Sequence, residues 1–215
     1  MKIAIFDMDG TLLDSMWMWR TVLTRFLKKL DLPNYEEINK AASHMSFTEA
    51  MRYVTDNYDV GMSSEELYGA LEKYILYLYE NLIEIKPYVR KYLDQLSEDG
   101  VKICLATLTE RHMVEVVLKR LDIYKYFDYI ITVPEVGKSK EYPDIYEDCL
   151  VKMGMKKEDA VVFEDAAYCL KTAHNAGFVC YGIEDAWQEF PDGFINEYCD
   201  RFIRSYAELL KSDKE

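Results

Sequence analysis

Two aspartates, Asp7 and Asp9, stand two positions apart directly after the apolar run 3–6. Four apolar residues that end at carboxylates predict a buried strand that stops at a charged loop. Residues two apart in a strand face the same side, and Gly10 permits a sharp turn that keeps both carboxylates in one cleft. Such a pair could serve as nucleophile and general acid/base, with a divalent cation offsetting their repulsion. A turn that merely uses Asp and Gly is the structural alternative.

The elements that must position these carboxylates follow from residue 101 onward, where short apolar runs alternate with helical stretches. Strands are expected at 101–106, 129–133, 160–163, 178–181 and 201–203, and helices at 111–121, 143–153 and 166–175. Strands that are apolar throughout and spaced by helices indicate a parallel sheet covered on both faces, to which 3–6 also belongs. We therefore predict an α/β fold with a Rossmann-like parallel sheet and helices on both faces.

The segment 15–85 has a different pattern, with helical periodicity and no strand run. Helices are expected at 16–30, 47–58 and 63–82, and Pro87 is expected in the first turn of a returning helix that ends near Gly100. The tyrosines Tyr68, Tyr74, Tyr77 and Tyr79 are interpreted as packing residues of this segment. An all-helical block inserted after the first strand predicts a cap domain at 15–85 and a core domain made of 1–14 and 86–215.

Open α/β sheets bind ligands at the carboxyl ends of their strands. The polar residues expected at that rim are Asp7, Asp9, Thr107, Thr109, Lys138, Lys140, Glu164 and Asp165. Hydroxyls, a lysine and several carboxylates at one rim predict a site for phosphate and a metal ion. Oxygen ligands without a His or Cys cluster favour Mg²⁺ over zinc.

Composition limits the partners. The chain has 26 basic and 39 acidic residues, a net charge of -13, which repels nucleic acid and anionic membranes, so neither is expected as a partner. No apolar run approaches the ~20 residues of a membrane span, and the first residues do not resemble a signal peptide. The five cysteines are scattered and lack CxxC spacing, which argues against a disulfide framework and is typical of the reducing cytoplasm.

Four motifs in sequence resemble the haloacid dehalogenase (HAD) superfamily, in its C1-capped phosphatase and β-phosphoglucomutase-like branch. Residues 7–15, Asp-Met-Asp-Gly-Thr-Leu-Leu-Asp-Ser, resemble the first motif, and Thr107 matches the second. Lys140, followed by Pro143 and Asp144, is similar to the third motif, K-x-x-P-D. Glu164 and Asp165, followed by Ala176 and Gly177, resemble the fourth. The family usually has Ser and Gly where this chain has Ala166 and Cys169, and Ala166 removes a helix-capping hydroxyl.

The resemblance implies a role for each motif residue. Asp7 would attack phosphorus and form an aspartyl-phosphate, and Asp9 would protonate the leaving oxygen and then activate water. Mg²⁺ would be held by Asp7, the main-chain carbonyl of Asp9 and Asp165, with Glu164 as a ligand or as a neighbour of the ligands. Thr107 and the N–H of Leu108 would hold the phosphoryl oxygens. Lys140 would stabilise the developing negative charge.

Some assignments stay open. Lys138 competes with Lys140, although the spacing to Pro-Asp favours Lys140. Asp185 is interpreted as a turn residue, and His44, His112 and His174 as structural residues without partners.

The resemblance implies phosphoryl transfer, because dehalogenase and phosphonate-cleaving branches lack an Asp at the position of Asp9. The sequence favours a phosphatase of a small phosphorylated metabolite, because 15–20 contains no His and 43–48 contains no Arg, which sugar-phosphate mutases usually have there. The resemblance also implies a monomer, because the cap of these proteins supplies the lid. A mutase of the β-phosphoglucomutase type is the alternative. A catalytically weak phosphate-binding regulatory module is the alternative from another class.

Overall fold

The computed structural model describes residues 1–32, 34–42 and 45–211. Its contacts divide the chain into two compact units: Met1–Met16 with Ile83–Glu215, called the core unit, and Trp17–Leu82, called the helical unit. The expectation for His44 lies outside the described residues.

The core unit contains a six-stranded parallel sheet in the order β5-β4-β1-β6-β7-β8. The strands are β1 (Ile3–Phe6), β4 (Lys102–Thr107), β5 (Tyr129–Thr132), β6 (Ala160–Glu164), β7 (Val179–Ile183) and β8 (Arg201–Ile203). β1 lies at the centre, since Ile3 pairs with Lys102 of β4 on one side and with Ala160 of β6 on the other. The predicted fold class is confirmed.

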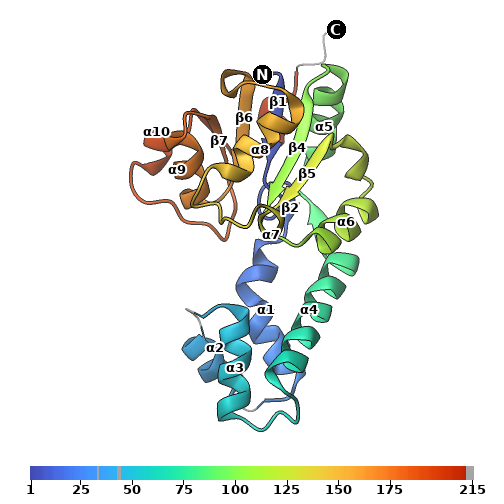
Figure 1. Cartoon of the computed structure of the whole chain (residues 1–215), viewed down its shortest axis with the longest axis vertical. Helices are drawn as coiled ribbons and strands as arrows, with labels where there is room; N and C mark the ends of the chain where they lie inside the picture. Colours follow the sequence, from blue (N-terminus) through green and yellow to red (C-terminus); the bar gives the residue numbers. More distant parts are fainter. Residues whose placement is uncertain (33, 43–44, 212–215) are drawn as a thin grey trace. The chain divides into compact units, whose positions relative to one another are not determined.

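Helices cover both faces of this sheet (Figure 1). α5 (Val89–Glu98) and α6 (Arg111–Arg120) connect β1 to β4 and β4 to β5, stepping outward in one direction. α8 (Asp144–Met153), α9 (Ala167–Asn175) and α10 (Phe194–Tyr198) connect the strands that step in the opposite direction. Right-handed crossovers in opposite directions place their helices on opposite faces. The shorter elements of the core unit are α7 (Val133–Val136), η1 (Tyr124–Tyr126), η2 (Lys157–Asp159) and η3 (Tyr206–Leu209).

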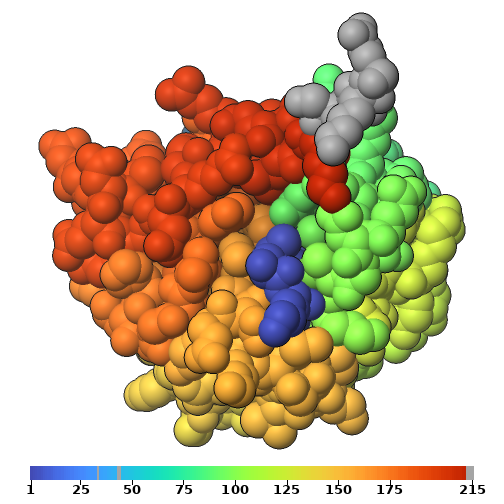
Figure 2. Space-filling model, turned by 90° about the horizontal axis from the view of Figure 1, so that it is seen from above, coloured from blue at the N-terminus to red at the C-terminus, as the bar shows by residue number. Residues whose placement is uncertain are grey.

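Because both faces are covered, all four residues of β1 are buried. Ile3 and Ile5 belong to a cluster with Tyr146 of α8 and Leu170 of α9. Phe6 stacks on Phe163 at a centroid distance of 4.3 Å. Figure 2 looks onto the core unit where the first residues, in blue, emerge between green and orange segments, as a central strand requires.

The structure corrects three local expectations. β2 (Leu13–Asp14) pairs antiparallel with β3 (Glu84–Ile85), so the prediction of no strand in 15–85 is wrong at its last two residues. Two residues are too few to show a period. Lys86 accepts a hydrogen bond from Val89, so Pro87 occupies a turn before α5, whose N-cap Tyr88 has φ +66°. Val133 begins α7 instead of ending β5.

The helical unit contains α1 (Met16–Lys29, whose first residue belongs to the core unit), α2 (Tyr35–Ala42), α3 (Phe47–Asn57) and α4 (Ser64–Asn81). The sequence did not predict α2. Ser46 and Ser63 cap α3 and α4, each in a reciprocal capping box. Tyr79 is fully buried and Tyr74 stacks on Phe26, as expected of packing residues, whereas Tyr77 is half exposed.

None of the described helices combines the length and the apolar character needed to cross a membrane.

Candidate active site

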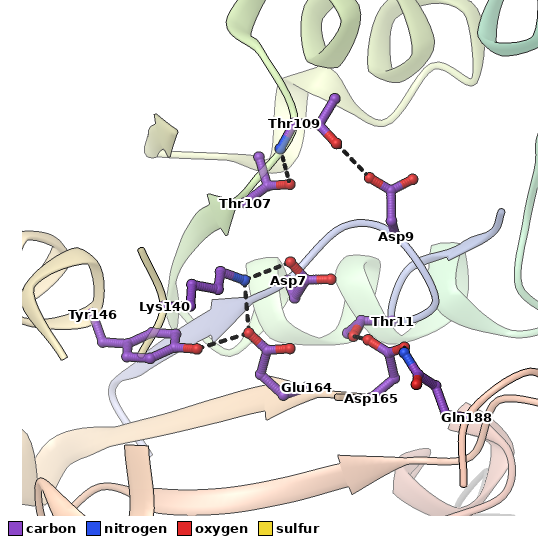
Figure 3. A network of polar contacts seen from close by, with 10 residues as sticks. All are labelled: Asp7, Asp9, Thr11, Thr107, Thr109, Lys140, Tyr146, Glu164, Asp165 and Gln188. Carbon is purple, nitrogen blue, oxygen red and sulfur yellow. Dashed lines mark hydrogen bonds and ion pairs between the residues drawn. The ribbon is translucent and has the colours of Figure 1, made fainter. Parts of the chain in front are cut away.

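The sheet brings the predicted polar residues to one rim. Asp7 follows β1, Thr107 ends β4, and Glu164 ends β6 with Asp165 next in the chain. Parallel strands end at the same edge, so residues that are far apart in sequence meet there (Figure 3).

Lys140 is the cation at the centre of this rim. Its side chain is fully buried, and its Nζ lies 2.5 Å from Asp7 Oδ1 and 2.7 Å from Glu164 Oε1. Burial alone would lower the pKa of Lys140, but the carboxylates of Asp7 and Glu164 outweigh it and raise that pKa well above its ordinary value. Lys138 is mostly exposed and pairs with Asp144. Of the two lysines, the structure therefore brings Lys140 to the carboxylates.

Three buried carboxylates form a cluster, and two of them, Asp7 and Glu164, pair with this lysine. One oxygen each of Asp7, Glu164 and Asp165 lies within 4.8 Å of the others. Burial raises the pKa of Glu164 to about 8, against the opposing charge of Lys140. Burial and the charge of Asp7 raise the pKa of Asp165 to about 7, and burial also raises that of Asp7. Three carboxylates against one ammonium group leave a negative excess that favours a further cation.

Neighbouring side chains orient these carboxylates. Glu164 Oε1 also accepts a hydrogen bond from the Tyr146 hydroxyl at 2.8 Å. Asp165 accepts one from Thr11 Oγ1 at 3.1 Å and one from Gln188 Nε2 at 3.0 Å. These hydrogen bonds hold the Glu164 and Asp165 carboxylates in fixed orientations in the buried rim.

Gly10 is required by this packing. Its φ is +82°, and a Cβ there would lie 2.3 Å from Asp165 Oδ2. Only glycine combines this backbone conformation with such a close approach.

Asp9 lies apart from the three clustered carboxylates, turned towards Thr109 in Figure 3. Thr109 Oγ1 donates to Asp9 Oδ2 at 2.6 Å, and Ser15 Oγ donates to Asp9 Oδ1 at 2.7 Å. The half-buried carboxylate is therefore held by two hydroxyl groups. These two hydrogen bonds orient the Asp9 carboxylate, which does not pair with Lys140.

Thr107 and Leu108 lie at the end of β4. The Thr107 side chain is buried, and its Oγ1 accepts a hydrogen bond from the N–H of Thr109 at 3.2 Å. Because the oxygen is the acceptor, the hydroxyl proton remains able to donate to a ligand. The Leu108 side chain is half exposed. The phosphate-binding roles expected for these two residues stay predictions.

Other candidates have identified contacts. Asp185 accepts a hydrogen bond from the N–H of Trp187 at 2.9 Å, the turn geometry expected for it, and also pairs with Lys86. The expectation that His112 and His174 have no partners is wrong. His112 Nδ1 lies 3.6 Å from Glu110 Oε2, and the His174 ring packs edge-on against Tyr198.

Five residues at the rim were not assigned roles from the sequence: Thr11, Ser15, Thr109, Tyr146 and Gln188. Thr11 and Ser15 belong to the first motif and Tyr146 follows the third. Their places in or beside these motifs could have indicated a role at the site. Thr109 was placed at the rim but given no role. Gln188 is a single polar residue in the loop after β7, and no pattern in the sequence marks it.

The family model for haloacid dehalogenase-like hydrolases matches residues 4–183. The chain belongs to this family. A phosphorylated carbohydrates phosphatase of Thermotoga maritima is 27% identical over 184 residues, which are 85% of each chain. Hexitol phosphatase B of Escherichia coli K12 is 28% identical over 166 residues, which are 76% of this chain and 74% of the relative. The expected class, a HAD-type phosphoric monoester hydrolase, is confirmed.

Solved structures agree on the fold. CbbY of Rhodobacter sphaeroides, solved with phosphate, has a TM-score of 0.74 at 23% identity and covers 97% of this chain and 96% of its own. A candidate β-phosphoglucomutase of Thermotoga maritima has a TM-score of 0.81 at 24% identity over 94% of each chain. At these identities the likeness concerns the fold alone.

Members of this family generally use Mg²⁺, and the residues of this rim fit that ion. The clustered donors, Asp7, Glu164 and Asp165, are all carboxylates and are buried at one point. Hard oxygen donors with an excess of negative charge suit Mg²⁺, which binds through one or two carboxylates and keeps several waters.

Proposed function

We propose that this protein is a Mg²⁺-dependent phosphatase that hydrolyses a small phosphorylated metabolite through an aspartyl-phosphate on Asp7. The observation that carries the proposal is the buried Lys140, which bridges Asp7 and Glu164 beside Asp165. A buried cation next to a nucleophilic carboxylate allows a phosphate dianion to approach a protein of net charge -13.

In this proposal, Asp7, Asp165 and the main-chain carbonyl of Asp9 hold the ion, with Glu164 as a further ligand or as the partner that fixes Lys140. Bound Mg²⁺ would neutralise the phosphoryl oxygens and orient the substrate. Thr107 and the N–H of Leu108 would donate hydrogen bonds to the same oxygens.

The first step is attack by a carboxylate oxygen of Asp7 on phosphorus. The Asp7 O–P bond forms, the ester P–O bond breaks, and the leaving oxygen takes a proton from Asp9. Lys140 stabilises the charge that moves between Asp7 and the transferring group. Positioning and charge stabilisation supply most of the catalysis in phosphoryl transfer.

The second step returns the enzyme to its starting state. Asp9, now ionised, takes a proton from water, and the water oxygen attacks the phosphorus on Asp7. The Asp7 O–P bond breaks, which releases inorganic phosphate and restores the carboxylate. The hydrogen bonds from Ser15 and Thr109 hold Asp9 in one place for both proton transfers.

The substrate proposal rests on the relatives. Two of them are named for phosphorylated carbohydrates and for hexitol, so we infer a phosphorylated sugar or sugar alcohol. Residues 15–85 would form a cap domain that selects the leaving group, and residues 1–14 and 86–215 would form the catalytic core. We further propose that the protein is a monomer and that it is cytoplasmic. The free cysteines, four of five of which are buried thiols, support the reducing compartment.

Phosphate release from a panel of sugar, sugar-alcohol and nucleotide monophosphates tests this proposal, with Mg²⁺ and with EDTA. We expect release that requires Mg²⁺, is fastest with carbohydrate phosphates, and falls by about 10²–10⁴-fold in Asp9→Asn. Isomerisation of a sugar phosphate without net phosphate release would contradict hydrolysis and indicate a mutase. Tight phosphate binding without any turnover would indicate a regulatory binding module.

A further inference from the structure

The loop after β7 reaches back to the carboxylate cluster through Gln188. Gln188 Nε2 donates to Asp165 Oδ2 at 3.0 Å, while Thr11 Oγ1 donates to Asp165 Oδ1 at 3.1 Å (Figure 3). Asp165 is 2% exposed. Two donors on opposite oxygens fix the plane of the carboxylate, and with it the direction of its remaining lone pairs.

The loop itself is anchored by a charged pair. Lys86 Nζ lies 2.9 Å from Asp185 Oδ2 and donates to the main-chain carbonyl of Glu184 at 2.8 Å. Asp185 Oδ1 accepts from the N–H of Trp187, and the Asp185 carbonyl accepts from the N–H of Gln188 at 3.2 Å. The Asp185 side chain is 3% exposed and that of Lys86 is 13% exposed. A nearly buried ion pair with further hydrogen bonds holds its geometry firmly.

Lys86 is in turn tied to the segment that carries the first motif. Its N–H donates to the Leu12 carbonyl at 2.9 Å, directly beside the β2–β3 pairing. A continuous series of contacts therefore connects the end of β3 to the carboxylate cluster. It passes through Lys86 and Asp185 to Gln188 and Asp165.

We propose that Gln188 is a positioning residue that sets the metal-binding orientation of Asp165, and that Lys86 holds the loop carrying it. This rests on the proposed Mg²⁺ dependence. Groups that hydrogen-bond to metal ligands orient them, and their removal typically weakens metal binding about 10–100-fold.

A direct role in substrate binding is the competing explanation. Gln188, Lys86 and Asp185 also line a cavity of about 880 Å³ in the core unit, together with Phe190 and Phe202. A ligand in that cavity could contact the Gln188 amide. The two roles differ in what they change: positioning changes Mg²⁺ affinity in the absence of substrate, whereas a substrate contact changes KM alone.

Titration calorimetry of Mg²⁺ into the full-length protein without substrate separates them. Gln188→Met keeps the length of the side chain and removes the donor, and we expect its Mg²⁺ dissociation constant to rise about ten-fold. Gln95→Met is the matched control, because Gln95 makes two hydrogen bonds elsewhere in the core unit, to Leu209 and Lys211. We expect native Mg²⁺ affinity in the control.

Two further variants keep the test decisive. Gln188→Asn retains the amide on a shorter chain and serves if Gln188→Met does not fold; we expect weakened Mg²⁺ binding there also. Lys86→Met keeps the Gln188 amide but removes the contacts that hold its loop, so it should weaken Mg²⁺ binding less than Gln188→Met does. Native Mg²⁺ affinity in the folded Gln188 variants, with a raised KM, would overturn the positioning role. Absence of Mg²⁺ binding by the native protein would instead overturn the proposed function.

Discussion

The core unit and the helical unit differ in what they bury. Among the described residues, the buried charged, serine and threonine side chains all lie in the core unit: Asp7, Thr11, Ser15, Thr107, Thr109, Thr132, Lys140, Glu164, Asp165 and Asp185. The described side chains buried in the helical unit are aliphatic, aromatic or methionine.

The core unit therefore buries groups that can take part in chemistry, whereas the helical unit buries side chains that pack against one another. Burying an ionised group costs several kcal/mol unless partners offset it, so a fold retains such groups where their charges have a use. The core unit does so with Lys140 between Asp7 and Glu164. The helical unit carries its polar groups at the surface, in helix caps and exposed turns, where they cost little. Substitutions in the two units should therefore fail in different ways.

The largest expected effect is that of Asp7→Asn. The substitution keeps the shape but removes the proposed nucleophile, so we expect phosphate release to fall by at least ~10⁴-fold. Asp56→Asn, on an exposed position of α3 in the helical unit, makes the same chemical change and should leave the rate unchanged. Steady-state assays of both purified variants check this. Near-native turnover in Asp7→Asn would place the reacting group elsewhere.

Lys140→Met should damage both activity and stability. It leaves two buried carboxylates without their cation, so we expect the free energy of unfolding to fall by about 3 kcal/mol. Phosphate release should fall by ~10²-fold or more. Lys138→Met, two positions away, removes an exposed ion pair and should change stability by less than about 0.5 kcal/mol. Urea unfolding compares the two, and equal effects would contradict a special role for the buried lysine.

The pH dependence of stability should arise from the core unit. Burial raises the pKa of Asp165 to about 7 and that of Glu164 to about 8 in the metal-free protein, from ordinary values of 3.8 and 4.5. At pH values between the ordinary and the raised pKa of each group, the folded state binds more protons than the unfolded state. Stability therefore falls as the pH rises.

In EDTA, we therefore expect the melting temperature to drop by several degrees between about pH 5 and pH 8. Mg²⁺ should recover the loss at the higher pH, since the ion binds ionised ligands. Asp165→Asn is the control, and its drop should be smaller. A native melting temperature that rises with pH over this range would contradict the assignment.

The smallest expected effect belongs to the helical unit. Ser63→Ala removes the cap of α4, where Ser63 accepts a hydrogen bond from the N–H of Glu66. We expect a loss of ~1 kcal/mol in stability and an unchanged kcat. Thermal unfolding and a steady-state assay well below the melting temperature measure the two quantities. A large fall in kcat would contradict the view that the core unit carries the chemistry and that α4 of the helical unit contributes only packing.

Much of the core unit could be predicted from the sequence because its signals are local. The strand runs are apolar throughout, and the charged residues at their ends mark the rim before any contact is known. Lys140 could be separated from Lys138 by its spacing to Pro143. The sequence did not predict β3, because an element of two residues is too short to show an alternating pattern.

The partners of the site residues were harder to predict. Gln188 meets Asp165 only because β6 and β7 are neighbours and the loop after β7 turns back, held by Lys86 from another part of the chain. Contacts of this kind depend on loop geometry, which the pattern of residue types does not encode. Tyr146 lies near a recognisable motif, but its hydrogen bond to Glu164 follows from the packing of α8 on the sheet.

The central claim, phosphoryl transfer to Asp7, can be tested by trapping the intermediate in Asp9→Asn with p-nitrophenyl phosphate and Mg²⁺. The nitrophenolate leaves without a proton, so Asp7 can be phosphorylated, whereas its hydrolysis requires the missing base. Mass spectrometry after an acid quench should find one phosphoryl group on the peptide that contains Asp7, and none in the Asp7→Asn/Asp9→Asn double variant. A phosphoryl group on another residue, or none during substrate turnover, would contradict the account.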